Sequence, residues 1–403
     1  MIPYGRQDIV DTDIEAVLEV LRSDYITQGP RVPKFEQAVA SRARARHAVA
    51  FNSATSALHG ACLALGVGAG DLVWTIPNTF VASANCARYC GADVDFVDID
   101  PLTWNISVGA LQDKLVRARR ERRLPKVVIP VHFAGQPTEQ EQIAELAREF
   151  DFRVLEDASH SIGATRCGEP VGSCRWSDIT VFSFHPVKII TTGEGGMALT
   201  NDPDLALRMS MARSHGITRD PSRFRGPRVT SDARGSPDPD ARSEFGGWYY
   251  EQQSLGFNYR MTDIHAALGL SQLARLTDFV TRRNELARRY SEGLRGLPLR
   301  LPVVQEANRS AFHLFVVRLE GAVDRARHRE VYERLRQKGI GVNVHYVPVH
   351  LQPYYRELGF AEGLCPEAEA HGASAITLPL FPALDEAQQD QVMQAVADAV
   401  RYG

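Results

Sequence analysis

The chain has 403 residues and a net charge of −3, from 46 lysines and arginines against 49 aspartates and glutamates. Hydrophobic residues make up 44% and charged residues 24%, a balance typical of a globular protein long enough for two domains. The near-neutral charge gives no indication of a nucleic-acid partner, and no apolar run approaches membrane-spanning length. Because the N-terminus also lacks the apolar core of a signal peptide, we expect a cytoplasmic protein.

The cysteines predict free thiols. None belongs to a CxxC pair, and the one pair spaced by four residues has no second ligand pair at the distance typical of a zinc site. We therefore expect no bound metal and no disulfide framework. The six cysteines are Cys62, Cys86, Cys90, Cys167, Cys174 and Cys365.

The first half of the chain alternates short apolar runs with helical patterns. The runs are rich in Val, Ile and Phe and show no clean apolar–polar alternation, which is typical of strands buried on both faces of a mostly parallel sheet. The pattern predicts an α/β fold with helices on both sides of that sheet. The predicted strands cover 47–51, 72–76, 94–99, 126–133, 152–157, 179–184 and 196–201.

The second half predicts a smaller α+β unit. Residues 219–247 are rich in Pro, Gly, Ser and charge and predict a long loop, and a long helix is predicted from about 262 to 290. A domain boundary near residue 268 would give a large domain, 1–268, and a small domain, 269–403. The elements predicted beyond the long helix are a strand at 312–320, a helix at 322–338, a strand at 341–347 and a last helix from Asp385.

The strongest chemical signal is a lysine just beyond a predicted strand. Lys188 follows Ser183 by five residues and precedes the Gly-rich segment 191–196. A lysine amine can form a Schiff base with an aldehyde cofactor, the serine can bond a phosphate, and the glycines allow a tight turn beside a bound ring. The alternative is a surface lysine in a Gly-rich turn.

A second signal lies at the end of another predicted strand. Asp157 ends the strand at 152–157 and His160 follows it, and open α/β sheets bind ligands beyond the carboxyl ends of their strands. Pyridoxal phosphate (PLP) needs a carboxylate beside its ring nitrogen, because a protonated ring is the better electron sink. The alternative is a helix-capping aspartate and a packed histidine.

Two further segments follow strands in the same way. At 52–59 a strand runs into small hydroxyl residues and then a helix, whose N-terminus can hold a phosphate. Phe80 follows the next strand and can stack on a flat ring. Ordinary capping and an ordinary core phenylalanine are the alternatives. The four signals together supply a lysine, a carboxylate, a phosphate cradle and a stacking face, and so predict a PLP site.

This set of residues resembles the sugar aminotransferases of the DegT/DnrJ/EryC1/StrS family, which have the fold type I PLP architecture. The resemblance runs from Tyr4 to Leu380. It implies a large domain with a seven-stranded sheet, a small C-terminal domain, and a homodimer with shared active sites.

The resemblance also implies roles for individual residues. Lys188 would hold the cofactor and act as general acid and base, and Asp157 would pair with the ring nitrogen. His160 stands where the family often has Gln, near the phenolic oxygen of the cofactor. Further cofactor contacts are implied for Ser183, for Ala54 and Thr55 (where the family commonly has Gly-Thr), for Phe80, and for Asn258, which would reach the neighbouring subunit.

Several strings look similar to the pseudaminic-acid branch of the family, among them 23–30, 84–101, 184–198, 248–263 and 344–360. Enzymes of that branch move an amino group from L-glutamate to C4 of a UDP-linked 4-keto-6-deoxy-N-acetyl-L-hexosamine. Their product is UDP-4-amino-4,6-dideoxy-N-acetyl-β-L-altrosamine, and pyridoxamine phosphate is the intermediate form of the cofactor. Substrate contacts are implied for Tyr4, His215, His345, Tyr346 and His350.

Other functions stay open at this point. An aminotransferase for another nucleotide-linked 4-keto-6-deoxy sugar, of the D-series or linked to dTDP, would carry the same motifs. Sugar dehydratases that share the fold have His in place of the lysine, so Lys188 argues against a lyase. A NAD-dependent enzyme would need a GxGxxG after the first strand, which is missing. A non-catalytic regulator would not need an intact lysine, aspartate and phosphate cradle.

Overall fold

The computed structural model describes residues 1–225, 248–321 and 324–401. Most of the predicted loop at 219–247 therefore lies outside the described residues. None of the described helices is long and apolar enough to cross a membrane.

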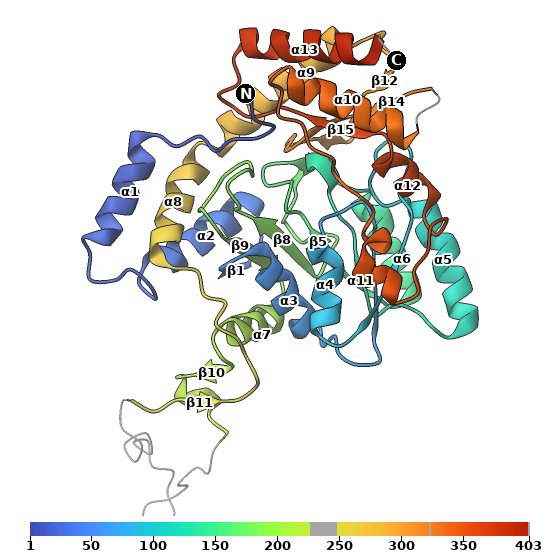
Figure 1. The fold of residues 1–403 in the computed structure, drawn as a ribbon. Helices are drawn as coiled ribbons and strands as arrows, with labels where there is room; N and C mark the ends of the chain where they lie inside the picture. The colour runs from blue at the N-terminus through green and yellow to red at the C-terminus, as the bar shows by residue number, and fades with distance from the viewer. Residues whose placement is uncertain (226–247, 322–323, 402–403) are drawn as a thin grey trace, which may run out of the picture.

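A seven-stranded sheet forms the centre of the molecule, and all seven predicted strands belong to it (Figure 1). β9 runs antiparallel to both of its neighbours, and the other pairings are parallel. In spatial order the strands are β1 (His47–Phe51), β9 (Gly196–Thr200), β8 (Ile179–Ser183), β5 (Arg153–Asp157), β4 (Val127–Ile129), β2 (Leu72–Thr75) and β3 (Asp93–Phe96).

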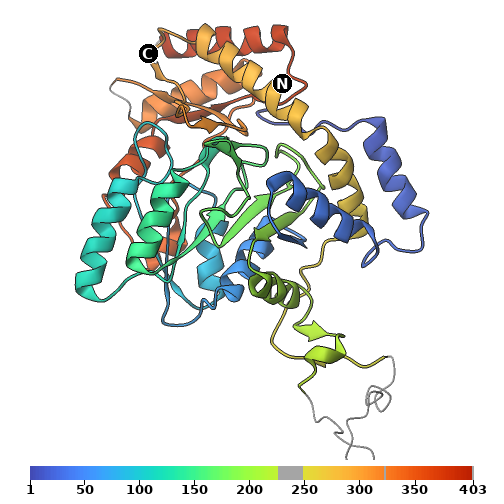
Figure 2. The same ribbon diagram turned by 180° about the vertical axis from the view of Figure 1, so that it is seen from behind.

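Helices cover both faces of this sheet (Figures 1 and 2). Within β4, Val127 and Ile129 pack in the core on one side, and Val128 packs in the core on the other. Successive strand residues point to opposite faces, so β4, which has an apolar core on both sides, is apolar at every position. One face carries α3 (Ala54–Ala64), α4 (Ala82–Tyr89) and α7 (Pro203–Arg213); the other carries α2 (Arg31–Ala43), α5 (Val108–Glu121) and α6 (Gln140–Phe150).

The helix predicted from 262 to 290 is two helices, α8 (Asp263–Ala274) and α9 (Leu276–Gly293). Arg275 separates them, with φ −96° and ψ 3°. Its guanidinium bonds Asp13, which is fully buried, at 2.6 Å and Asp8 at 2.7 Å. These contacts with the N-terminal segment are long-range, so the helical periodicity alone does not reveal the break.

α9 belongs to two cores at once. Phe279 and Val280, in its first half, pack in the core beside the large sheet. Leu286 and Tyr290, in its second half, pack in a separate core formed by the C-terminal part of the chain.

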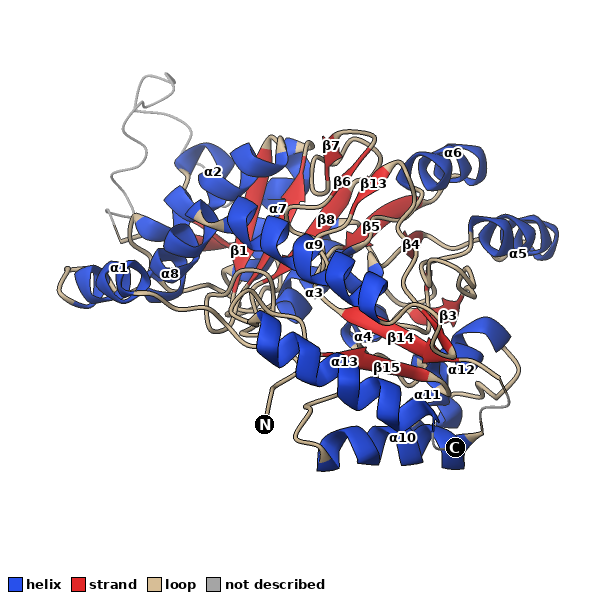
Figure 3. Cartoon of the chain, turned by 90° about the horizontal axis from the view of Figure 1, so that it is seen from above, coloured by secondary structure: helices blue, strands red, loops and turns tan. Residues whose placement is uncertain are grey.

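The C-terminal core is built on a three-stranded sheet covered by helices (Figure 3). The predicted strand at 341–347 is wrong: the segment makes only an isolated bridge, Asn343 to Thr377. Four of its residues line the pocket described below instead of continuing a ladder. The boundary near residue 268 stays a prediction. The elements are β12 (Leu299–Arg300), β14 (Phe315–Leu319), β15 (Ala375–Leu378), α10 (Arg325–Gln337) and α13 (Glu386–Arg401).

A short antiparallel pair, β10 (Ile217–Thr218) and β11 (Glu251–Gln252), projects from the body of the molecule in both Figures 1 and 2. The remaining elements are α1 (Asp11–Leu21), β6 (Thr165–Arg166), β7 (Glu169–Pro170), β13 (Asn308–Arg309), α11 (Pro353–Glu357), α12 (Pro366–Gly372) and the 3-10 turns Phe133–Gly135, Pro221–Arg223 and Val349–Leu351.

Asp263 holds the start of α2 to the start of α8. Its carboxylate is fully buried and accepts hydrogen bonds from the backbone N–H of Gly29, at 2.8 Å, and of Arg31, at 2.7 Å. We expect Asp263→Asn to lower the free energy of unfolding by about 3 kcal/mol, because the amide replaces one acceptor with a donor facing an N–H. Urea unfolding measures this, with Asp278→Asn on exposed α9 surface as the control. A loss equal to that of the control would contradict it.

Candidate active site

A cavity of about 870 Å³ opens at the carboxyl ends of β5 and β8. At this edge of the sheet, the ends of separate strands bring the predicted motifs together. Open α/β sheets bind their ligands at this edge. Its lining comes from both halves of the chain, since 313 and 343–346 complete the wall. Of the predicted site residues it includes Lys188, Asp157, His160, Ser183, Ala54, Thr55, Phe80, Tyr4, His345 and Tyr346.

The N-terminus of α3 forms one wall of this cavity. Ser53 caps the helix, with its hydroxyl accepting from the Ser56 N–H at 3.1 Å. The first N–H groups of a helix, here those of Ala54 and Thr55, have no intrahelical acceptor and suit an anion. A Cβ on Gly196 of β9 would lie 2.5 Å from the nitrogen of Ala54, so only glycine allows this close approach. Ser183 adds a hydroxyl on the same lining, and together these groups fit a phosphate.

Asp157 ends β5 and presents a buried carboxylate to the cavity. One of its oxygens accepts from the Ser83 hydroxyl at 2.6 Å. The other accepts from the Ser159 hydroxyl at 2.5 Å and the Ser159 N–H at 3.1 Å. These donors fix the direction of the carboxylate. A buried carboxylate held in this way suits a protonated ring nitrogen.

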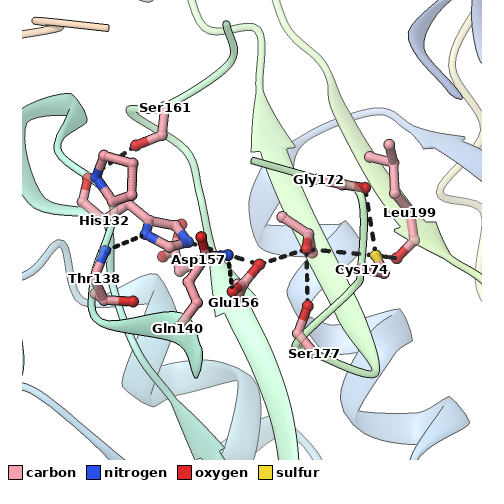
Figure 4. A network of polar contacts seen from close by, with 12 residues as sticks. His132, Thr138, Gln140, Glu156, Asp157, Ser161, Gly172, Cys174, Ser177 and Leu199 are labelled. Carbon is pink, nitrogen blue, oxygen red and sulfur yellow. Dashed lines mark hydrogen bonds and ion pairs between the residues drawn. The ribbon is translucent and has the colours of Figure 1, made fainter. Parts of the chain in front are cut away.

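Glu156, one residue earlier, points to the other face of β5 and belongs to a polar network there (Figure 4). It accepts from the Thr180 hydroxyl at 2.7 Å and from the Gln140 amide, and lies 3.7 Å from Nε2 of His132. Burial raises the pKa of Glu156, but His132 and the two hydrogen bonds hold that pKa below its usual value. The network thus anchors the strand that carries Asp157.

Lys188 lines the cavity five residues after β8 ends. Burial lowers the pKa of its amine to about 8, although the charge of Asp157 acts in the opposite direction. About one-tenth of such amines are deprotonated at pH 7, compared with fewer than about one in a thousand for an ordinary lysine. A free amine is the form that attacks an aldehyde or takes a proton.

Buried histidines and a tyrosine surround this amine. His160 bonds the Tyr346 hydroxyl at 3.3 Å, and its ring lies 4.4 Å from that of His313. Burial holds the pKa of His160 and of His313 well below the usual value and lowers the pKa of His345 to about 3. Burial also raises the pKa of Tyr346. All four side chains are therefore neutral at physiological pH.

Three predicted site residues lie elsewhere. His350 is buried outside the cavity and bonds Glu369 at 2.8 Å, which favours a structural role. His215 is exposed beside β10, and Asn258 is exposed in the segment before α8. Neither lines the cavity of its own chain. Phe80 does line it, at the mouth, with 59% of its surface exposed.

Sequence reasoning missed His313, Ser83 and Ser159. The two serines lie in a helix and a turn, and their local sequence gives no indication that they contact Asp157. His313 stands at the start of the predicted strand 312–320, and the sequence marks it only as a polar residue beside an apolar run.

A family model described as the DegT/DnrJ/EryC1/StrS aminotransferase family matches residues 7–397. The chain belongs to this family. It is 37% identical over 403 residues to the spore coat polysaccharide biosynthesis protein SpsC of Bacillus subtilis, covering 99% of this chain and 97% of that protein.

Two solved structures superpose on the chain with a TM-score of 0.87. One is the putative sugar aminotransferase Spr1654 of Streptococcus pneumoniae in its PMP form, 30% identical and matched over 99% of each chain. The other is Helicobacter pylori PseC, an aminotransferase involved in the biosynthesis of pseudoaminic acid, 28% identical and matched over all of each chain. Spr1654 is also known in a PLP form. As a member of the DegT/DnrJ/EryC1/StrS family, this chain is a PLP-dependent sugar aminotransferase of fold type I.

Asp157→Asn tests the carboxylate. Asparagine keeps the size of the side chain but cannot balance a positive ring nitrogen, so we expect amino transfer to slow by about 100-fold or more. Ser83→Ala, which leaves the carboxylate in place, serves as the control and should lose only a few-fold. Single-turnover rates with L-glutamate measure both; a two-fold effect of Asp157→Asn would show that this residue does not pair with the ring.

Proposed function

We propose that this enzyme moves an amino group from L-glutamate to C4 of a UDP-linked 4-keto-6-deoxy-N-acetyl-L-hexosamine, giving the 4-amino sugar nucleotide of pseudaminic-acid biosynthesis. The observation that carries the chemistry is the convergence of Lys188 and Asp157 in one cavity, at the ends of adjacent parallel strands. The sugar assignment is supported by the strings that resemble the pseudaminic-acid branch and by the likeness to PseC.

When bound, PLP supplies an aldehyde that accepts the amino group and a ring that spreads negative charge. Lys188 would hold the cofactor and, once free, its amine would take the proton from the α-carbon of the donor. Asp157 would face the ring nitrogen and favour its protonated form. The N-terminus of α3, with Thr55 and Ser183, would bind the phosphate and so orient the ring.

The neutral side chains of the cavity wall suit a sugar. Tyr4, His345 and Tyr346 line the cavity together, and their hydroxyl and imidazole groups can donate to and accept from sugar oxygens. His345 is oriented by a 2.7 Å hydrogen bond between Nδ1 and the Thr377 hydroxyl. Because these groups are uncharged, they recognise a keto sugar without perturbing the charge of Lys188.

A second candidate is an aminotransferase for a D-series or dTDP-linked 4-keto-6-deoxy sugar. The observation in its favour is that SpsC, which is named for spore coat polysaccharide biosynthesis, is more similar in sequence than PseC, at 37% against 28% identity. Both candidates use the same lysine, aspartate and phosphate cradle.

The two candidates separate in one experiment. The enzyme is converted to its pyridoxamine form with L-glutamate, the donor is removed, and the UDP-4-keto-6-deoxy-N-acetyl sugars of L-arabino and D-xylo configuration are added separately. We expect the absorbance of the PLP form to return quickly with the L-arabino sugar only. Fast return with the D-xylo sugar alone would overturn the sugar assignment and leave the aminotransferase chemistry intact.

We further propose a homodimer in which the arm at β10 and β11 completes the partner's site. Asn258 is exposed and lies outside its own cavity, and the mouth of that cavity leaves Phe80 exposed. On the arm, Trp248 and Leu255 have 81% and 82% of their surfaces exposed. Large apolar side chains on a projecting segment are typical of a protein interface. The cytoplasmic location stays a prediction from the sequence.

Leu255→Asp tests the dimer. A charge placed in an apolar interface should convert the dimer to monomers and lower activity in parallel, since Asn258 of each arm would leave the other site. Sedimentation velocity gives the mass. Leu102→Asp, at an exposed leucine between β3 and α5, is the matched control and should change neither. A wild-type enzyme that is fully active as a monomer would contradict the proposal.

A further inference from the structure

His313 contacts the reactive lysine from the C-terminal half of the chain. Its Nε2 lies 3.5 Å from Nζ of Lys188, and only 4% of its surface is exposed. No step of the proposed mechanism uses this histidine, and a polar ring is costly to bury without a purpose.

The backbone around His313 is held in place from two sides. The buried guanidinium of Arg283, on α9, donates to the carbonyl oxygens of Phe312 and His313, both at 3.2 Å. The neighbouring N–H of Ala311 donates to Gly135 at 2.9 Å, and that of Leu314 donates to Ala134 at 3.2 Å. The ring is therefore carried by a fixed segment rather than a free loop.

The hydrogen bonds of the ring indicate which nitrogen carries the proton. Nδ1 of His313 is buried and has no hydrogen-bond partner within the described residues. Buried N–H groups without a partner are rarer than buried acceptors without one, so the proton belongs on Nε2. That N–H points to Lys188, whose ammonium form has no lone pair to accept it. The geometry therefore favours the free amine.

We propose that His313 is a positioning residue: its Nε2–H donates to the free amine of Lys188. This bond holds the deprotonated side chain in place after the half-reaction with the amino donor and before the half-reaction with the sugar. This inference rests on the lysine chemistry and not on the identity of the sugar.

The groups around the amine act in opposite directions. Asp157, at the end of β5, favours the ammonium form of Lys188. His160, after β5, and His345, in the segment after α10, are neutral and, like His313, would be repelled by that ammonium if protonated. Tyr346 is also neutral. Among these groups in the described residues, His313 is the one in hydrogen-bond contact with the amine. It therefore offsets the effect of Asp157, which favours the ammonium form of Lys188.

Two substitutions separate a hydrogen-bonding role from a packing role. His313→Phe keeps a ring against His160 but removes the N–H. His313→Gln loses the ring but places an amide N–H close to the position of Nε2. The proposal expects the glutamine variant to behave like the wild type and the phenylalanine variant to fail, whereas a packing role expects the reverse.

The first measurement uses the enzyme loaded with pyridoxamine phosphate, the form in which Lys188 is free. Trace acetylation of Lys188 by acetic anhydride is followed by peptide mass spectrometry across neutral and alkaline pH. In His313→Phe we expect the apparent pKa of Lys188 to rise by about one unit and its labelling at neutral pH to fall about ten-fold. In His313→Gln we expect labelling within about two-fold of wild type. Because no sugar is present, failure here is distinct from failure of the proposed function.

The second measurement is the single-turnover rate with L-glutamate. We expect this rate to stay close to wild type in His313→Gln and to fall in His313→Phe. His350→Gln, which alters a buried histidine outside the cavity, is the control for general destabilisation, and thermal melting checks each variant. His313→Met is a second apolar variant if the phenylalanine protein does not fold. The proposal would be overturned if Lys188 were acetylated at the wild-type level in the apolar variants, or if its acetylation were lost in the glutamine variant.

Discussion

The parallel pairing of β5 with β8 is the interaction on which the cavity depends. It sets Asp157 opposite Val181, and so brings Asp157 and the segment that carries Lys188 to the same edge of the sheet. Register matters because adjacent strand residues face opposite sides. A slip of one residue would send Glu156 into the cavity and Asp157 into the network of Figure 4, where Thr180 and Gln140 satisfy the glutamate. The network therefore specifies which carboxylate faces the cavity.

Much of the large sheet could be predicted from local sequence. Apolar runs without alternation identify strands buried on both faces, and all seven predicted strands belong to the sheet. The place of Lys188, Asp157 and Thr55 in the cavity could be predicted for the same reason, because each lies at or just beyond the end of such a strand and the carboxyl ends of parallel strands share one edge. Local sequence was enough to predict a site residue wherever the topology of the sheet alone brings that residue to the cavity.

The rest depends on contacts between distant segments. His313 meets Lys188 across 125 residues, and no local pattern marks that contact. At the break between α8 and α9, Arg275 bonds Asp8 and Asp13 in the N-terminal segment, and the helical periodicity on either side continues without a signal. The segment 341–347 has the composition of a strand, but it gives its side chains to the cavity instead of a neighbouring strand. In each case tertiary contacts override a local preference.

The two cores share one helix, and this limits how the enzyme can move. α9 has Phe279 in the core of the large sheet and Tyr290 in the C-terminal core, with Arg283 between them bonded to the carbonyls of Phe312, His313 and Leu380. Separating the two cores would require α9 to bend at this point and the buried guanidinium of Arg283 to lose its acceptors. Hinge opening is therefore unfavourable, and we expect reactants to reach the cavity on the side where Phe80 is exposed, without a change in the packing of α9.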